Sequence, residues 1–259
     1  MNQEKRILVC EDSMEGIFSA VYDGWKECAG GCKVSIQTSF PVSMELFTSY
    51  REIATDQSKA GKVMRTILMR LGSEVYEQIC LAAASADEDR GTAIYYVLHR
   101  AFGGGRCEKR VMEALPDPYV SRVAKLALCV KREYHHYFGF VRFREIGGRF
   151  LLAKIQPAND ILSLMALHFS NRFPNENWVI YDEKRQKALC HEKGKECVMR
   201  KGVRIQVPGS TVGDMGEYEE LWQTFCDSIS IEARRNEKLQ KQMLALHFRS
   251  NMPEFSVKG

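Results

Sequence analysis

The sequence lacks the long apolar run that a membrane-spanning helix requires. In a chain of 259 residues, no uninterrupted apolar stretch approaches the roughly 18 residues that a span needs. The first apolar run, residues 7–10, is also too short for the core of a secretory signal. The nine cysteines are odd in number and scattered, which is typical of reduced thiols and not of a disulfide framework. We therefore expect a cytoplasmic protein without a membrane segment.

Common motifs of nucleotide binding and nucleophilic catalysis are absent as well. The chain contains neither Gly-x-x-x-x-Gly-Lys-Ser/Thr, which cradles phosphates, nor the Gly-x-Ser-x-Gly of serine hydrolases. Cys28 and Cys32 lack the third nearby cysteine that a radical iron–sulfur cluster requires. Cys190, His191 and Cys197 lack a fourth ligand at zinc-site spacing. We expect no bound metal and no cofactor.

The charge balance is mildly basic. Lysine and arginine number 37 against 33 acidic residues, which gives a net charge of +4. This charge permits nucleic-acid binding without requiring it, so only local clustering of cations favours such a partner. The length and the 45% hydrophobic content are sufficient for one large domain or two small ones.

The first half of the chain predicts two short strands followed by helices. Residues 5–10 and 34–36 are typical of buried strands, and Asp12 or Ser13 can cap a helix over residues 14–27. Residues 56–130 are predominantly helical. Their helices are expected over residues 56–71 (capped by Thr55 or Asp56), 75–86, 90–102 and 119–134, with breaks at Gly72, at the glycines 103–105, and at Pro116 and Pro118.

Short strands replace helices near Tyr137. The pair Gly147-Gly148 between residues 138–146 and 149–155 predicts a two-residue hairpin turn. The later elements are expected as a helix from Asn159 or Asp160 to residue 173, a hairpin of residues 178–181 and 187–190, a strand over 203–207, and a long helix over 217–246.

This order of elements predicts an α+β protein. It has a helical N-terminal and middle region, then a compact unit of antiparallel sheet and helix, and a long C-terminal helix that closes it. We expect a division into residues 1–136 and residues 137–259, with one continuous domain as the alternative.

The strand expected over residues 138–146 carries the main candidate for nucleic-acid binding. Alternate residues of a strand face opposite sides. The residues that would share one face are Phe138, Phe140, Arg142 and Arg144. Such a mixture on an exposed sheet face resembles the platforms that stack bases and hold phosphates. The alternative is a pair of core-facing phenylalanines, with the arginines at the rim and paired to Glu133 or Asp182.

Further cations extend this candidate interface. His168 and Arg172 lie four residues apart on the edge of a helix whose apolar face includes Phe169. The alternative is a boundary histidine beside an arginine whose stem covers apolar surface. The final helix is basic in its second half, which the helix dipole explains in part. The complete set of nucleic-acid-binding candidates is Phe140, Arg142, Arg144, His168, Arg172, Arg185, Arg234 and Arg235.

An enzyme acting directly on DNA, such as a glycosylase-like or nuclease-like protein, is a second hypothesis. Its candidate acid, base or metal-ligand groups are Glu145, Asp160, His168 and Asp182. A pocket on which these side chains converge would favour this hypothesis, whereas dispersal into caps and ion pairs would oppose it. A third hypothesis is a structural adaptor whose basic residues are simply solvated.

Separated sequence blocks resemble a bacterial family of uncharacterised function that is associated with DNA metabolism or DNA repair. The blocks are Phe-Val-Arg-Phe-Arg-Glu at 140–145, Ile-Gln-Pro-Ala-Asn-Asp at 155–160, His-Phe-Ser-Asn-Arg-Phe at 168–173, Trp-Val-Ile-Tyr-Asp at 178–182 and Arg-Arg-Asn at 234–236. The resemblance runs from Asp12 to Arg234, and residues 243–259 match least. Members of this family are encoded beside a radical S-adenosylmethionine protein, and in some bacteria the domain is fused to a uracil-DNA glycosylase-like domain.

The resemblance implies a DNA context and a radical S-adenosylmethionine partner, and it supplies no catalytic residues. Together with the absent motifs, it favours an accessory DNA-binding protein in DNA repair or modification. In this hypothesis a partner enzyme performs the chemistry.

Overall fold

The computed structural model describes most of the chain. The described residues are 5–28, 33–41, 45–103, 108–148, 150–203, 244, 246–249, 251–252 and 255. Their contacts divide the chain into two compact units between Arg132 and Glu133, inside the long helix α5 (Pro118–Phe140). Each unit has its own β-sheet, and the expected α+β class is confirmed.

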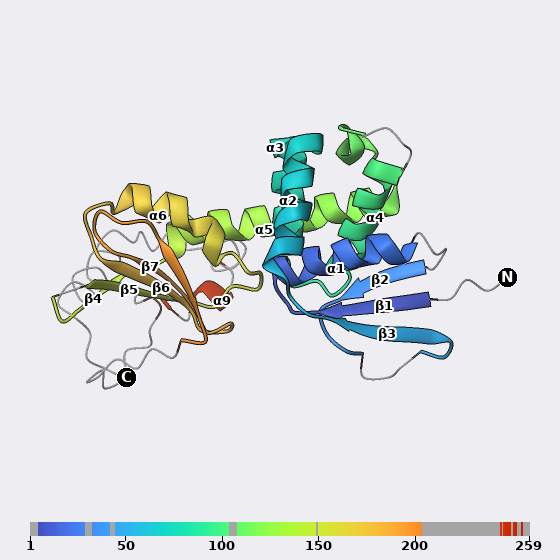
Figure 1. Cartoon of the computed structure of the whole chain (residues 1–259). Helices are drawn as coiled ribbons and strands as arrows, with labels where there is room; N and C mark the ends of the chain where they lie inside the picture. The colour runs from blue at the N-terminus through green and yellow to red at the C-terminus, as the bar shows by residue number, and fades with distance from the viewer. Residues whose placement is uncertain are drawn as a thin grey trace, which may run out of the picture. The chain divides into compact units, whose positions relative to one another are not determined.

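The first unit contains a parallel three-stranded sheet (Figure 1). Its strands are β1 (Lys5–Cys10), β2 (Lys33–Gln37) and β3 (Thr48–Ile53), in the order β2-β1-β3. β1 and β2 confirm the expected strands, whereas β3 was not predicted. β3 is an edge strand in which only Ile53 is buried, so its mostly polar sequence gives no apolar strand signal.

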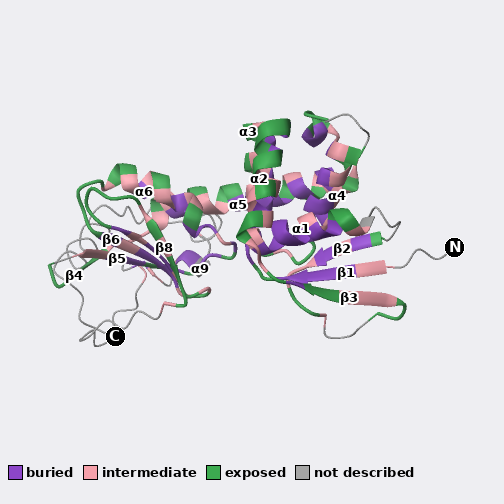
Figure 2. Ribbon diagram, in the orientation of Figure 1, coloured by how far each residue is buried: buried purple, intermediate pink, exposed green. Residues whose placement is uncertain are grey.

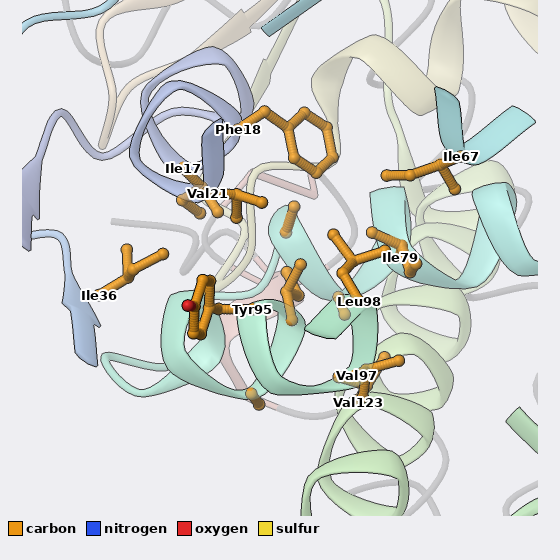
Figure 3. Close-up of a cluster of buried hydrophobic side chains, with 14 of the residues drawn as sticks. Ile17, Phe18, Val21, Ile36, Ile67, Ile79, Tyr95, Val97, Leu98 and Val123 are labelled. Atoms are coloured by element: carbon orange, nitrogen blue, oxygen red, sulfur yellow. The ribbon is translucent and has the colours of Figure 1, made fainter. Parts of the chain in front are cut away.

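Helices pack against this sheet and against one another. They are α1 (Met14–Cys28), α2 (Gln57–Leu71), α3 (Ser73–Ala83), α4 (Arg90–Gly103), the 3-10 turn η1 (Val111–Glu113) and the first part of α5. The four expected helices of residues 56–134 are confirmed, with shifted ends in α3 and a longer α5. Figure 3 shows how Phe18, Ile36 and Ile79 bring side chains from α1, β2 and α3 into one fully buried core.

Local capping explains where the helices of this unit begin. Ser13 Oγ accepts a hydrogen bond from the backbone N–H of Gly16 at 3.0 Å, and Asp56 Oδ1 accepts from the N–H of Ser58 at 2.8 Å. Of the expected alternatives, Asp56 therefore caps α2, and Ser13 provides the cap of α1. A side chain at Gly16 would place its Cβ 2.4 Å from the carbonyl oxygen of Glu11, so the tight entry into α1 requires glycine.

The second unit contains a mixed five-stranded sheet. Its strands, in spatial and chain order, are β4 (Arg144–Ile146), β5 (Phe150–Ile155), β6 (Trp178–Asp182), β7 (Lys187–His191) and β8 (Val198–Lys201). The hairpins are antiparallel as expected, but β5 and β6 are parallel. A helical crossover lies between β5 and β6, and such connections join parallel strands.

That crossover is the expected helix of residues 160–173 in modified form. It begins as a 3-10 turn, η2 (Leu162–Met165), and continues as α6 (Ala166–Arg172). Ile161, Met165 and Phe169 are buried, so the expected apolar face is the one that packs inward. Figure 2 shows buried residues on the side of the crossover that meets the sheet of this unit.

The strand expected over residues 138–146 is wrong for its first part. Residues 138–140 form the last turn of α5, and β4 begins only at Arg144. The amphipathic spacing of α5 continues through the buried Tyr137, and helix packing here overrides the strand preference of the phenylalanines. Gly147 and Gly148 have φ angles of 59° and 63°, which confirms a tight hairpin turn at the glycine pair. Its expected length of two residues is wrong, because Ile146 pairs with Phe150 and leaves three residues between the strands.

Two elements predicted near the C-terminus lie mostly outside the described residues. β8 (Val198–Lys201) was not predicted: the strand expected over residues 203–207 shares no residue with it, Val203 is not in a strand, and residues 204–207 lie outside the described part. The helix expected over residues 217–246 also lies almost wholly outside it, and the described α9 (Leu246–Arg249) follows. Among the described residues, every helix is too short or too polar to cross a bilayer.

Candidate nucleic-acid interface

The aromatic and basic residues before β4 do not share a strand face, because the chain changes from helix to strand between them. Arg142 lies in the connection, where its Nη1 donates a hydrogen bond to the carbonyl oxygen of Gly139 at 2.7 Å. It therefore satisfies a carbonyl that the end of α5 leaves without a helical partner. Arg144 is exposed at the start of β4, opposite Leu152 of β5.

Phe140 belongs to an aromatic contact within the second unit. Its ring lies 5.1 Å from that of Phe248 and 6.0 Å from that of His136. Phe248 is buried and also contacts Tyr137 at 4.8 Å. Phe140 thus packs against α9 and does not form part of a flat sheet platform.

A different pair of aromatic rings is stacked at the end of α5. The imidazole of His168 on α6 lies parallel to the ring of Phe138, with 3.8 Å between centroids and an angle of 10°. His135, one helical turn before Phe138, and Arg172, one turn after His168, are exposed. We call His135, Phe138, His168 and Arg172 the stacked cluster.

Arg172 gives the stacked cluster a positive charge. Burial lowers the pKa of His168 below its ordinary value, and the positive charges of Arg172 and His135 lower it further. The Nε2 atom of His168 is buried and has no hydrogen-bond partner among the described residues. A nearby anion would relieve this repulsion, because it would stabilise the protonated imidazole and the guanidinium together.

The block Ile-Gln-Pro-Ala-Asn-Asp is held by a carboxylate from α5. Glu133 accepts hydrogen bonds from the backbone N–H of Ala158 at 2.7 Å and of Asn159 at 3.0 Å. It also accepts one from the Asn159 side-chain amide at 2.6 Å. This role of Glu133 could not be predicted from the sequence, since its partners lie about 25 residues away and are mostly backbone groups. Glu133 therefore fixes the loop that follows β5.

Asp182 and Arg185 hold the same loop from the other side. Asp182 is fully buried, and its Oδ1 accepts from the backbone N–H of Lys184 at 3.0 Å and of Arg185 at 3.1 Å. The guanidinium of Arg185 donates to Asp182 Oδ2 at 3.1 Å and to the carbonyl oxygen of Pro157 at 3.0 Å. Burial raises the pKa of Asp182, while these hydrogen bonds and the charge of Arg185 oppose the shift. Both side chains are engaged in holding the fold.

The candidate catalytic carboxylates do not converge on one pocket with His168. Asp160 pairs with Lys187, and Lys187 lies opposite Asp182 in the β6–β7 hairpin. Asp160 and Asp182 are therefore neighbours. Glu145 lies opposite Leu151, which in turn lies opposite Trp178. Trp178 precedes Asp182 by four residues, so Glu145 is displaced from Asp182 by about 13 Å along the strands. His168 is stacked on Phe138 on α5.

Cys190 lies near Cys197, because it pairs with Val198 in the β7–β8 ladder, but His191 has a separate environment. Cys190 and His191 are adjacent in a strand and therefore point to opposite faces. The ring of His191 stacks on Trp178 at 5.0 Å, and Cys197 Sγ lies 3.0 Å from Ser170 Oγ. Within the described ranges, no three side chains of histidine, cysteine, aspartate or glutamate form a group that could hold a metal.

The first unit has a depression at the carboxyl ends of its parallel strands, where ligands commonly bind in α/β sheets. It encloses about 490 Å³ and is lined by Cys10, Thr38 and Thr55 among others. Burial raises the pKa of Cys10 to about 12, so its thiol is protonated and unsuited to nucleophilic attack. This depression was not predicted from the sequence, because one wall comes from the unpredicted strand β3. Beside it, the buried Arg90 is paired with Asp12.

The remaining sequence candidates, Arg234 and Arg235, lie outside the described residues. Of the candidates that the structure describes, His168 and Arg172 lie together on α6. Phe138, which the sequence analysis placed on a strand, supplies the ring against which His168 stacks. Helical spacing on α5 was the signal that could have identified it.

The fold and these contacts define an α+β protein whose second unit combines a mixed sheet with a positively charged, stacked aromatic cluster. A family model described as a domain of unknown function, DUF4130, matches residues 88–254, and the chain belongs to this family. The match covers α4, α5 and most of the second unit. No curated protein matches the chain.

One comparison with solved structures is weak. A candidate family II inorganic pyrophosphatase from Methanococcus jannaschii aligns with 81% of this chain and 78% of its own, at 12% identity. Its TM-score of 0.17 is too low to support any argument about fold or function.

Proposed function

We propose that this chain is an accessory DNA-binding protein of DNA repair or modification, and that it acts beside a radical S-adenosylmethionine enzyme. The sequence blocks around residues 140–182 support the DNA context and the partner through their resemblance. The observation that carries the binding step is the stacked cluster, in which the His168 ring lies 3.8 Å from that of Phe138 beside Arg172.

The chemistry of the stacked cluster suits single-stranded or locally opened DNA. Bases stack on aromatic and imidazole rings whatever their sequence, because every base has a π-face. The guanidinium of Arg172 can donate two parallel hydrogen bonds to one phosphate. His135 and Arg172 are exposed on two different helices. A DNA strand can therefore contact both residues while one of its bases stacks on the rings of Phe138 and His168.

This role requires neither recognition of specific base edges nor catalysis by this chain. The carboxylates of Asp160 and Asp182 are occupied by Lys187 and Arg185. Binding through phosphates and stacking carries little sequence preference. The chain would hold DNA while its partner supplies the reaction.

Site-directed variants test which residues bind. A fluorescent single-stranded oligonucleotide is titrated with the full chain and with the variants Arg172→Ala and His168→Ala. We expect each variant to weaken binding by about 1 kcal/mol or more, which is about fivefold or more, because each removes a phosphate or stacking contact.

Two control variants keep this test specific. Leu167→Ala alters an exposed side chain of the same helix, and Lys195→Ala removes an exposed cation from the same unit. Both should bind DNA as the unaltered chain does. Equal losses in the controls and in the cluster variants would show that any cation contributes, and a folded Arg172→Ala with full affinity would refute the assigned interface.

A further inference from the structure

The first unit carries an apolar groove that the proposed function does not use. Its floor is formed by Val21, Ile67 and Leu98, which belong to the buried core shown in Figure 3. Helices α1, α2 and α4 supply the walls, and the groove encloses about 350 Å³. Because a packed core supports the floor, the groove is preformed in the folded unit.

Aromatic side chains line one side of the groove. Trp25 remains 37% exposed there, and its ring lies 6.1 Å from that of Phe102 in an edge-on arrangement. A tryptophan that packs on one side and is open on the other is a frequent anchor of protein interfaces. Trp25 therefore offers apolar surface to a molecule that enters the groove.

Lysines also lie at the groove. The Nζ atoms of Lys26, Lys59 and Lys62 lie 5.1, 6.0 and 5.9 Å from the centre of the Tyr22 ring. Lys59 is also paired with Asp23, while Lys26 and Lys62 line the groove itself. The sequence of α2 contains lysines and arginines and no acidic residue. The rim is therefore complementary to carboxylates.

The lining is elongated and not spherical. On α1 it repeats at Tyr22 and Lys26, and on α2 at Lys62 and Thr66, so it follows both helices for more than one turn. This shape fits an apolar stripe with anchors spaced one turn apart, as an amphipathic helix presents.

We propose that this groove docks an amphipathic helix of a partner protein whose apolar stripe is flanked by aspartate or glutamate. The stripe would bury Trp25, and the flanking carboxylates would pair with Lys26 and Lys62. The walls α1 and α2 precede residue 88, so they lie outside the matched family domain. The inference goes beyond the proposed function and stands whether or not the second unit binds DNA.

Two designed peptides test the proposal on the full chain. Each is a labelled helical peptide of about 16 residues, long enough to form a helix on binding. One has leucine or phenylalanine one turn apart with glutamates between them, and the other has lysines in place of the glutamates. Fluorescence anisotropy should show tighter binding of the glutamate peptide.

Variants locate that binding. Trp25→Ala should weaken the glutamate peptide at least about tenfold, as expected for an interface anchor. The double variant Lys26→Glu with Lys62→Glu should weaken the glutamate peptide and strengthen the lysine peptide. Leu128→Ala and Lys125→Glu, which alter exposed positions of α5 outside the groove, should change neither affinity by more than about twofold.

Other occupants would give different results. Equal binding of the two peptides would overturn the proposal. So would unchanged affinities of both peptides for the double variant Lys26→Glu with Lys62→Glu. So would binding of indole-3-acetate or of a single-stranded oligonucleotide that depends on Trp25 while the glutamate peptide does not bind. Circular dichroism establishes that each variant is folded, and the lysine double variant decides the matter if Trp25→Ala is not.

Discussion

At the scale of single residues, His168 should make stability depend on pH. Its pKa in the folded chain is below the ordinary value of 6.5, so the unfolded chain takes up this proton more readily. The contribution is fully present above pH 6.5 and is lost as the pH falls through that value towards the lowered pKa.

The substitution His168→Phe should reduce this dependence, because phenylalanine preserves stacking on Phe138 and does not titrate. The measurement is the free energy of unfolding in urea between pH 7.5 and pH 5.5 for both proteins. Identical slopes in the two proteins would show that the surroundings of His168 do not favour its neutral form.

Asp182 should be a residue of the fold and not of binding. Its carboxylate is fully buried and accepts hydrogen bonds from Lys184 and Arg185. Asp182→Ala leaves the Arg185 guanidinium without its carboxylate, which should lower the free energy of unfolding by about 3 kcal/mol. Asp160→Ala, which breaks a more exposed pair with Lys187, should cost less. A stable Asp182→Ala protein with altered DNA affinity would reverse this assignment.

At the scale of elements, the same substitution should have opposite effects at two glycines. Gly147 has a φ of 59° in the β4–β5 turn, so Gly147→Ala should lower the free energy of unfolding by about 1 kcal/mol. Gly61 lies inside α2, and a Cβ there would meet nothing within 4 Å. Gly61→Ala should therefore raise it by about 0.5 to 1 kcal/mol. Thermal or urea unfolding measures the change in the free energy of unfolding for each variant. A change of the same sign at both positions would contradict the backbone assignments.

The sequence predicted elements well where local chemistry determines them. Asp56 caps α2 and Gly72 ends it, and the glycine pair at 147 and 148 forms the turn between β4 and β5. It failed where tertiary packing decides, as at Phe138, which has strand-forming chemistry but completes α5 because the helix packs through Tyr137. β3 was missed because an edge strand need not alternate apolar and polar residues.

The candidate site was harder to predict than the elements. His168 and Arg172 were found through their helical spacing, but Phe138 was assigned to the wrong element, so its stack with His168 was not foreseen. Arg185 was selected as a cation, yet it holds the loop at Pro157. A sequence shows which residues are charged, whereas the partners of a charge depend on contacts between distant segments.

At the scale of the whole molecule, association with a radical S-adenosylmethionine enzyme remains a prediction from resemblance. We expect the two proteins to co-purify from one host. Failure to associate both with and without DNA would leave this chain as a stand-alone binder.

The most direct test of the central proposal is the salt dependence of DNA binding by the purified full chain. Single- and double-stranded oligonucleotides are titrated over a series of salt concentrations. Each neutralised phosphate contributes about −0.7 to −0.9 to the log–log slope, so the Arg172 contact alone should give a slope of about that size, with little sequence preference, and each further phosphate contact should steepen it by the same amount. No binding to either oligonucleotide at low salt would contradict the proposal that this chain is a DNA-binding protein.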